Sequence, residues 1–236
     1  MPILLLWFLW LAAPGQDEVK VKPQIAKVEF ENEEIRIVRV RYGPHDKIAM
    51  HSHPAKIAVC VTGGADRITG PDGKSSDSHP AAGDFFWAEP TKHEVENLSD
   101  EPLEFVEVEL KHASAPGAVV ATQPQPKYTE EPKEPVPVQF EPHHHPKFQN
   151  QYVRVLDVVI PPGESTYFHK HIYDSVAVVI ANGMSQNQVF GEEWTAPGPM
   201  TAGRIGFTED SKVPRLHRLK NAGTTTLHIV DLEILR

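Results

Sequence analysis

A His-x-His motif occurs twice in this chain, at residues 51–53 and again at residues 169–171. Side chains alternate between the two faces of a β-strand, so both imidazoles of such a motif point to the same side. Each motif is followed by a single histidine that has an asparagine four residues after it; these residues are His93, Asn97, His217 and Asn221. The pattern predicts two clusters of three histidines, which are His51, His53 and His93 in the first and His169, His171 and His217 in the second.

The two motifs belong to a longer internal repeat. A shift of 118 residues superimposes six identical pairs without a gap, and their members in the first copy are Phe30, Asn32, Arg36, Val40, His51 and His53. A shift of 124 residues superimposes five more, with first-copy members Pro90, His93, Asn97, Leu103 and Glu109. Chance similarity between two β patterns does not explain histidines that coincide at both ends, so we interpret the chain as a tandem duplication.

The composition favours strands over helices. The 236 residues include 22 prolines and 15 glycines, and 40% of them are hydrophobic, which is enough for packed cores. Residues 34–42 and 103–110 alternate apolar and charged side chains, which is typical of strands with one buried face. Further strands are expected at residues 57–62 and 84–88. We therefore predict an all-β chain with many turns.

A proline-rich stretch divides the repeat. Residues 113–142 contain seven prolines, which interrupt both helix and sheet and favour extended backbone. We predict a first domain at residues 28–112, a Pro-rich linker at 113–139 and a second domain at 140–236.

The N-terminal residues predict export. Residues 3–13 form an apolar run that is too short to span a bilayer and that ends in small residues, as in a secretory signal peptide. We predict a signal peptide at residues 1–16, a secreted or periplasmic protein, and no stable membrane insertion after processing. Met1 and Pro2 supply no basic side chain, so a buried segment stays open as the alternative. Residues 17–27 are expected to be loosely held.

Charge and cysteine content exclude several classes of protein. The formal net charge of −9 argues against nucleic acid and against an anionic membrane surface as partners. The single cysteine, Cys60, excludes an intrachain disulfide and a cysteine-based zinc site. We interpret it as a buried structural residue.

Three converging imidazoles are good ligands for divalent transition metals, and they leave coordination positions open for water or substrate. The motifs also resemble the two motifs of the cupin superfamily, in which a His-x-His follows a glycine and a later histidine follows a glycine and a proline. Here the first copy has Gly43 before its His-x-His, then Gly83 and Pro90 before His93. The resemblance implies a two-domain cupin (bicupin) with two tandem jelly-roll β-barrels, each with one divalent metal.

The chain departs from the cupin pattern after each His-x-His motif. Cupins often place a carboxylate ligand there, but these positions hold Ile57 or Ala58 in the first copy and Ser175 or Val176 in the second. Each site is therefore predicted to use three histidines. Asp174 is near the second motif, but strand parity directs it away from the metal unless a bulge intervenes.

The other polar residues receive simpler interpretations. The tract at residues 143–145 is read as solvated histidines, and four carboxylates of alternating strands are predicted to lie on an outer face; they are Glu107, Glu109, Asp231 and Glu233. Four more histidines are treated as surface residues; they are His45, His79, His112 and His228. Tyr173 shares the parity of His171 and is expected to face the cavity.

Two functional hypotheses stay open. In the first, the protein is a metal-dependent enzyme of oxygenase or isomerase type that acts on a small organic molecule, with iron, manganese, nickel or zinc as the metal. In the second, it is a non-catalytic protein that binds a small molecule or has a structural role. No catalytic residue and no organic cofactor site is predicted, and a homodimer is one option for assembly.

Overall fold

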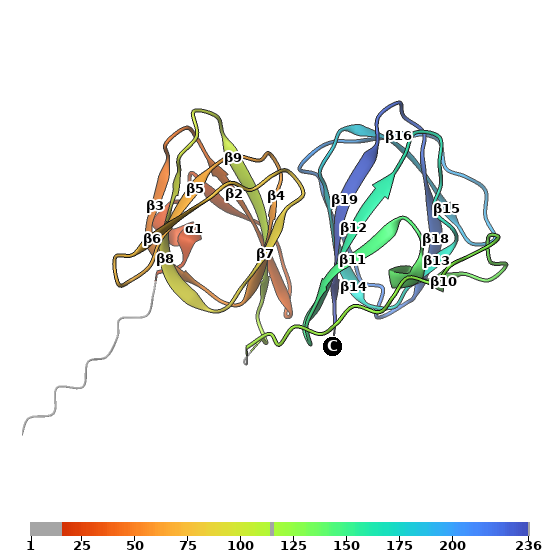
Figure 1. Cartoon of the computed structure of the whole chain (residues 1–236), viewed down its shortest axis with the longest axis horizontal. Coiled ribbons are helices and arrows are strands. Elements are labelled where there is room, and N and C mark those ends of the chain that lie inside the picture. Colours follow the sequence, from red (N-terminus) through yellow and green to blue (C-terminus); the bar gives the residue numbers. More distant parts are fainter. Residues whose placement is uncertain (1–15, 114–115, 236) are drawn as a thin grey trace, which may run out of the picture.

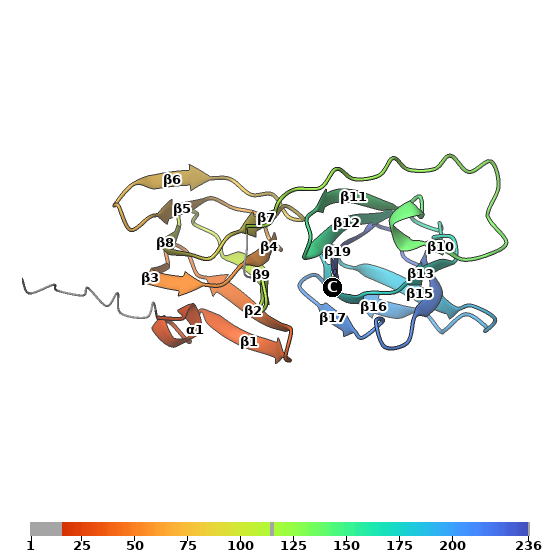
Figure 2. The ribbon, with the colours of Figure 1, turned by 90° about the horizontal axis from the view of Figure 1, so that it is seen from below.

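The computed structural model describes residues 16–113 and 116–235, and nearly all of its regular structure is β-strand (Figure 1). The strands form four sheets, three with five strands and one with four. Two sheets belong to the first half of the chain and two to the second half (Figures 1 and 2). The prediction of an all-β chain is confirmed.

In the first half, a short helix precedes two antiparallel sheets. The helix is α1, Glu18–Val21. The five-stranded sheet has the order β1 (Ala26–Glu31), β2 (Ile35–Tyr42), β9 (Leu103–Leu110), β4 (Lys56–Cys60) and β7 (Phe85–Ala88). The four-stranded sheet has the order β3 (Lys47–His53), β8 (Thr91–Asn97), β5 (Asp66–Thr69) and β6 (Ser75–Ser78).

The second half repeats this arrangement. Its first sheet has the order β11 (His144–Gln149), β12 (Val153–Ile160), β19 (Leu227–Ile234), β14 (Asp174–Val179) and β17 (Ile205–Thr208). Its second sheet has the order β10 (Val136–Pro137), β13 (His169–His171), β18 (Arg215–Asn221), β15 (Gly183–Val189) and β16 (Gly198–Met200). A 3₁₀ turn, η1 (Val138–Phe140), connects β10 to the region before β11.

The asparagines of the repeat hold equivalent turns. The Asn97 amide donates to the backbone carbonyls of Gly43 (3.0 Å) and Glu101 (2.8 Å). Asn221 donates in the same way to the carbonyls of Ile160 and Thr225, both at 2.8 Å. Both asparagines are fully buried, and they stabilise the fold rather than bind a ligand.

The repeat contains one shift of register that the sequence pattern does not show. Lys56 pairs with Glu109 in the first half, whereas Ser175 pairs with Glu233 in the second. Since Glu109 and Glu233 are equivalent, Lys56 corresponds to Ser175 and not to Asp174. One additional residue therefore lies between the His-x-His motif and this position in the second half.

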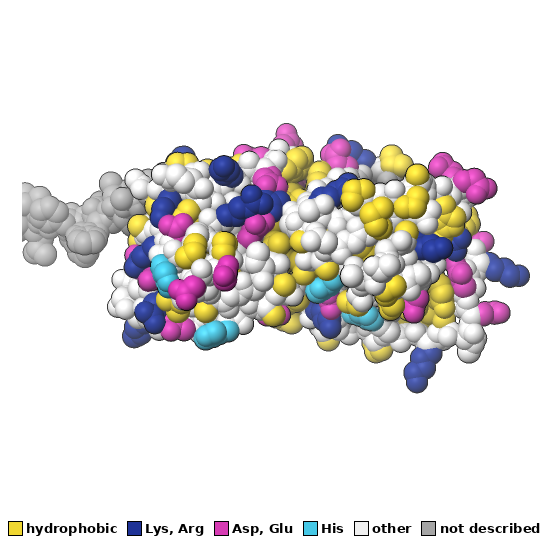
Figure 3. All heavy atoms as spheres, turned by 90° about the horizontal axis from the view of Figure 1, so that it is seen from above, with side chains coloured by type: hydrophobic (Ala, Val, Ile, Leu, Met, Phe, Trp, Pro, Cys, Tyr) yellow, Lys and Arg dark blue, Asp and Glu magenta, His cyan; other side chains and the backbone are white. Residues whose placement is uncertain are grey.

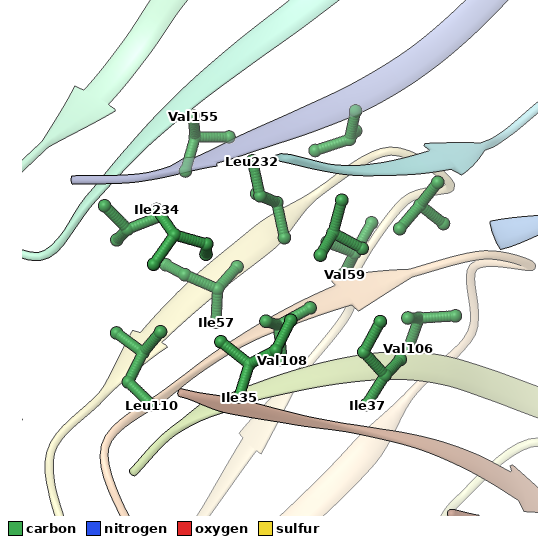
Figure 4. Close-up of a cluster of buried hydrophobic side chains, with 14 of the residues drawn as sticks. Ile35, Ile37, Ile57, Val59, Val106, Val108, Leu110, Val155, Leu232 and Ile234 are labelled. Carbon is green, nitrogen blue, oxygen red and sulfur yellow. The ribbon is translucent and has the colours of Figure 1, made fainter. Parts of the chain in front are cut away.

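Apolar side chains between the halves form the largest buried cluster. It combines residues of β2, β4 and β9 with residues of β12, β14 and β19, such as Val108 and Leu232 (Figure 4). The alternate residues of the same strands face inward within each half, where two smaller apolar clusters lie. The five-stranded sheet of each half is therefore covered on both faces.

This packing contradicts the predicted position of the carboxylates on β9 and β19. Val106 and Val108 face the other half, and Glu107 is buried on the opposite face with Phe105, toward the interior of its own half. Asp231 is buried in the same way. The alternation of apolar and charged residues was predicted correctly. However, the apolar side chains of these strands pack between the two halves, and the carboxylates face the interior of their own half.

The N-terminal predictions have different outcomes. Residues 1–15 lie outside the described residues, and with them nearly all of the predicted signal peptide at 1–16. The expectation that residues 17–27 are loosely held is wrong, because Glu18, Ile25 and Ala26 are buried. Within the described ranges, no helix is long and apolar enough to cross a membrane.

Residues 116–135 contain no helix or strand and run along the second half (Figure 2). The Val120 amide donates to the Gln149 carbonyl (2.8 Å), and Gln125 donates to the carbonyls of Gln139 and His144. These bonds attach the segment to β11 and to the turn before it.

Candidate metal centres

The three histidines predicted for the first half lie together. His51 on β3 is the register partner of His93 on the neighbouring β8, and His53 lies two residues further along β3. The His93 ring centroid is 4.7 Å from that of His51 and 4.8 Å from that of His53. The Nε2 atoms of all three are buried and have no hydrogen-bond partner among the described residues.

Backbone contacts orient two of these rings. His51 Nδ1 lies 3.0 Å from the Ala49 carbonyl, and His53 Nδ1 lies 2.6 Å from the Pro54 carbonyl. A proton on Nδ1 that is donated to a carbonyl leaves the lone pair on Nε2. Burial, with the Lys56 charge second, lowers the pKa of His53 to about 4 and that of His93 to about 3. The imidazoles of His53 and His93 are therefore neutral at pH 7, which is the form that binds metals.

Charged residues that were not predicted also line this first cavity. Lys56 is buried and makes a salt bridge with Glu107, and its Nζ lies 3.8 Å from Glu18 Oε2. Burial and the neighbouring Glu18 charge raise the pKa of Glu107 to about 8. Burial by itself would raise the pKa of Glu18, but Lys56 and His51 hold it well below its usual range. The remaining cavity is small, about 90 Å³.

The second half also brings its three predicted histidines together. His169 pairs with His217 across β13 and β18, and their ring centroids are 4.6 Å apart. The His171 ring lies 5.0 Å from the His169 ring and 5.2 Å from the His217 ring. His169 Nδ1 contacts the Tyr167 carbonyl at 2.9 Å, as His51 contacts Ala49 in the first half. Burial, followed by the charge of His144, lowers the pKa of His169 to about 3.

A fourth histidine, His144 on β11, joins the second cluster. Its ring centroid lies 4.5 Å from that of His169, and the ligand nitrogens of His144, His169 and His171 are within 4.8 Å of one another. Glu141 fixes the ring by a buried bond to Nδ1 (2.5 Å). The reading of residues 143–145 as solvated is therefore wrong for His144, which is 5% exposed.

A bulge turns His144 toward the second cluster, against the strand parity. The register of β11 against β12 shifts between Pro146 and Phe148, so Phe148 packs toward the other half while His144 faces inward opposite Val158. Parity counted back from Phe148 would have placed His144 on the wrong face. The only sequence signal was a histidine tract at the start of the repeat.

Both ring nitrogens of His217 have partners in this structure. Its Nδ1 lies 2.6 Å from Asn187 Oδ1, and its Nε2 accepts a hydrogen bond from Arg215 at 2.9 Å. The Arg215 guanidinium in turn donates from Nη2 to Asp210 Oδ2 at 2.8 Å. His217 thus lies in the cluster, but Arg215 occupies the nitrogen that would bind a metal.

The second cavity is larger, about 220 Å³. Apolar side chains form much of its wall; they are Val158, Ala177, Met200, Leu219 and Ile229. Arg215, Asn187 and Asp231 add polar groups. Burial and the Glu233 charge raise the pKa of Asp231 to about 7, and its Oδ2 lies 3.9 Å from His171 Nδ1.

Asp174 and Tyr173 are not among the residues that line the second cavity. The Asp174 carboxylate accepts hydrogen bonds from the backbone (3.0 Å) and the hydroxyl (2.5 Å) of Ser211, as expected for a side chain that points away from the histidines. The expectation for Tyr173 is wrong, because it follows β13 and parity does not extend beyond the end of a strand.

Both clusters present imidazole nitrogens toward a common centre. Neutral imidazoles are common ligands of these ions. Buried nitrogens without a partner are unfavourable, and the described residues leave His169 Nε2 and His171 Nδ1 in this state, in addition to the three nitrogens of the first cluster. The second cluster contains the compact group that could hold a metal ion.

The sequence matches no family model, and a comparison with curated proteins gives no match. Solved structures resemble the chain over most of its length. AerE from Microcystis aeruginosa is 17% identical, with 90% of this chain and 98% of AerE covered and a TM-score of 0.59. An oxalate decarboxylase of Bacillus subtilis with Mn(II) centres is 16% identical, with 92% of this chain and 71% of that chain covered and a TM-score of 0.55.

A cupin 2 conserved barrel domain protein from Leptotrichia buccalis is 12% identical, with 89% of this chain and 88% of that chain covered and a TM-score of 0.52. At these identities the likeness concerns the fold and not the activity. Together with the order of strands in the sheets, it shows that the chain has the cupin fold.

Proposed function

We propose that this protein is a bicupin in which two tandem jelly-roll barrels, at residues 28–112 and 140–236, each bind one divalent transition metal. The Pro-rich segment at 113–139 would connect them. The matching strand order of the two halves supports this proposal, as does the similarity to a protein with Mn(II) centres over 92% of the chain.

Buried imidazole nitrogens without partners are the observation on which the proposal depends. The ligands would be His51, His53 and His93 in the first centre, and His169, His171 and His217 with His144 in the second. For His217 to bind, Arg215 would have to release its Nε2. Iron, manganese, nickel and zinc all accept imidazole ligands, so the donors leave the choice of metal open.

The second centre is the better candidate for chemistry on a small organic molecule. Its 220 Å³ cavity combines apolar walls with the Arg215 guanidinium, which suits a small molecule with a carboxylate or another oxyanion. A bound metal would polarise an oxygen of the ligand or activate dioxygen. Asp231, with a pKa of about 7, is the residue in the cavity best suited to accept or return a proton.

Metal analysis of the purified protein tests the proposal, and we expect up to two equivalents per chain. No metal after reconstitution with iron, manganese, nickel or zinc would contradict it. Oxygen consumption and isomerisation of small organic acids would then be screened with the wild type and with Asp231→Asn. Turnover that Asp231→Asn lowers at unchanged metal content supports the enzyme, whereas binding without turnover supports the non-catalytic alternative.

We also propose a secreted or periplasmic location. The support is the apolar run at residues 3–13, and N-terminal sequencing of the native protein should begin after about residue 13. An intact Met1 in the cytoplasmic fraction would contradict export.

A small molecule remains the proposed partner rather than nucleic acid, since charges of both signs are interspersed on the face in Figure 3. A homodimer is an additional proposal, and light scattering tests it.

A further inference from the structure

The residues before β1 attach directly to the His-x-His strand of the first half. Ser52, which lies between His51 and His53, donates its backbone N–H to the Gln16 carbonyl (2.9 Å) and forms a parallel bridge with Asp17. Asp17 caps α1, because its carboxylate accepts the Val19 N–H at 2.9 Å. These contacts place the next residue, Glu18, beside the first histidine cluster.

The Glu18 carboxylate is enclosed and incompletely partnered. Its side chain is 1% exposed, and its Oε2 lies 3.4 Å from His51 Nε2. Its Oε1 is buried without a hydrogen-bond partner in the described part of the chain. The Lys56 ammonium lies 3.8 Å from Glu18 Oε2 and closer to Glu107. The Lys56 ammonium offsets the charge of Glu18, but it makes no hydrogen bond to the carboxylate and leaves Oε1 without a donor.

The second half has the same backbone arrangement without the carboxylate. Pro137 forms the parallel bridge with Lys170, which is the equivalent of Ser52, so the residue equivalent to Glu18 is Val138. Val138 is buried in the apolar cluster and has no donor atom in its side chain. There, His144 contributes the additional side chain from β11. A carboxylate at this position is thus not required for the backbone to attach.

We propose that Glu18 is the fourth metal donor of the first cluster, and that metal binding there is coupled to docking of residues 16–22. The inference rests on the proposed function, in which the first cluster holds a metal. A carboxylate beside three neutral imidazoles supplies a negative charge that offsets that of the cation. A metal held by Glu18 would in turn hold α1 against β3.

The test uses the full chain with His169→Ala and His171→Ala, so that only the first centre remains. In this background, Glu18→Gln and Glu18→Ala should weaken Co(II) binding at least about tenfold in chelator competition. They should also change the visible absorption spectrum of the bound Co(II), which a structural role alone would not do. The matched control is Glu101→Gln, which removes an exposed carboxylate.

Proteolysis tests the coupling. Lys20 is exposed, and trypsin should cleave after it more slowly when Co(II) is bound. Glu18→Gln should abolish this protection, and Glu101→Gln should retain it. Lys56→Met tests the alternative that Glu18 only neutralises the charge of Lys56 and does not bind the metal. If that were so, the double variant Glu18→Gln, Lys56→Met would regain full Co(II) affinity.

The outcomes separate the inference from the proposed function. Unchanged affinity and spectrum in the Glu18 variants, with complete loss in His51→Ala, His53→Ala, would overturn the inference and leave the metal site standing. Rescue by Lys56→Met would also overturn it. A background protein that binds no Co(II) would refute the first metal site itself, and the inference with it. Weaker binding with a changed spectrum and lost protection would support it.

Discussion

The two halves of the chain share one scaffold but surround their histidines with different side chains. The first cluster lies beside Glu18, Lys56 and Glu107, whereas the second lies beside His144, Arg215 and Asp231. Only Glu107 and Asp231 are equivalent by the repeat. The duplicated strands thus preserve the histidine cluster, while residues that differ between the copies, some of them on these same strands, make each cluster different.

The cavities differ for a physical reason that can be traced to one position. Lys56 extends into the first cavity from the position that Ser175 occupies in the second. The long side chain and its carboxylate partners fill space, and about 90 Å³ remains, compared with about 220 Å³ in the second half. The larger volume makes the second cavity the better candidate to hold a small-molecule ligand.

The largest expected effect tests whether the two centres are independent. Replacing His169 and His171 by alanine should remove about one metal equivalent per chain, because too few donors remain in the second cluster. The first cluster should retain its metal, as measured by elemental analysis of the dialysed protein. Loss of all metal would mean that the two centres depend on each other.

The core between the halves predicts that they unfold together. Leu232 is fully buried there, so Leu232→Ala should lower the free energy of unfolding by about 2–5 kcal/mol. We expect one denaturant transition that shifts as a whole, when circular dichroism and tryptophan fluorescence are compared. Val213→Ala, at a residue 75% exposed, is the control and should have little effect. Two separate transitions, only one of which moves, would show that each half unfolds by itself.

His144 is the additional donor that distinguishes the second cluster from the first. His144→Ala should weaken metal binding in the second half about 10- to 100-fold, because a buried imidazole next to His169 is removed. Chelator competition on metal-loaded protein measures the change. His145→Ala is the matched control, since that neighbouring side chain is exposed. Equal affinities for the two variants would leave the second centre with only the three histidines predicted from sequence.

The smallest expected effect concerns the repeated turns. Asn97→Ala and Asn221→Ala should each cost about 1–3 kcal/mol, because each change leaves two backbone carbonyls without their amide donor. Urea unfolding of the two variants should give similar values. A large difference would show that equivalent turns do not contribute equally to the two halves.

Strand patterns predicted much of the fold but could not orient the strands. The prediction for residues 103–110 matches β9, Leu103–Leu110, and the alternation within it is real. The apolar face was assigned to the interior of the half, yet Val106 and Val108 pack against the second half, and Glu107 faces the cavity. Alternation states which residues share a face; it does not state what covers that face.

The sequence alone determined the β-rich class, the internal repeat and the six histidines that gather into two clusters. These are local properties, because a His-x-His on a strand presents both rings on one side whatever surrounds it. Only the tertiary structure decided that Glu18 and His144 approach the clusters and that Lys56 narrows the first cavity. A parallel bridge places Glu18, a bulge places His144, and a one-residue change of register separates Lys56 from its expected equivalent. Strand parity does not carry across such irregularities.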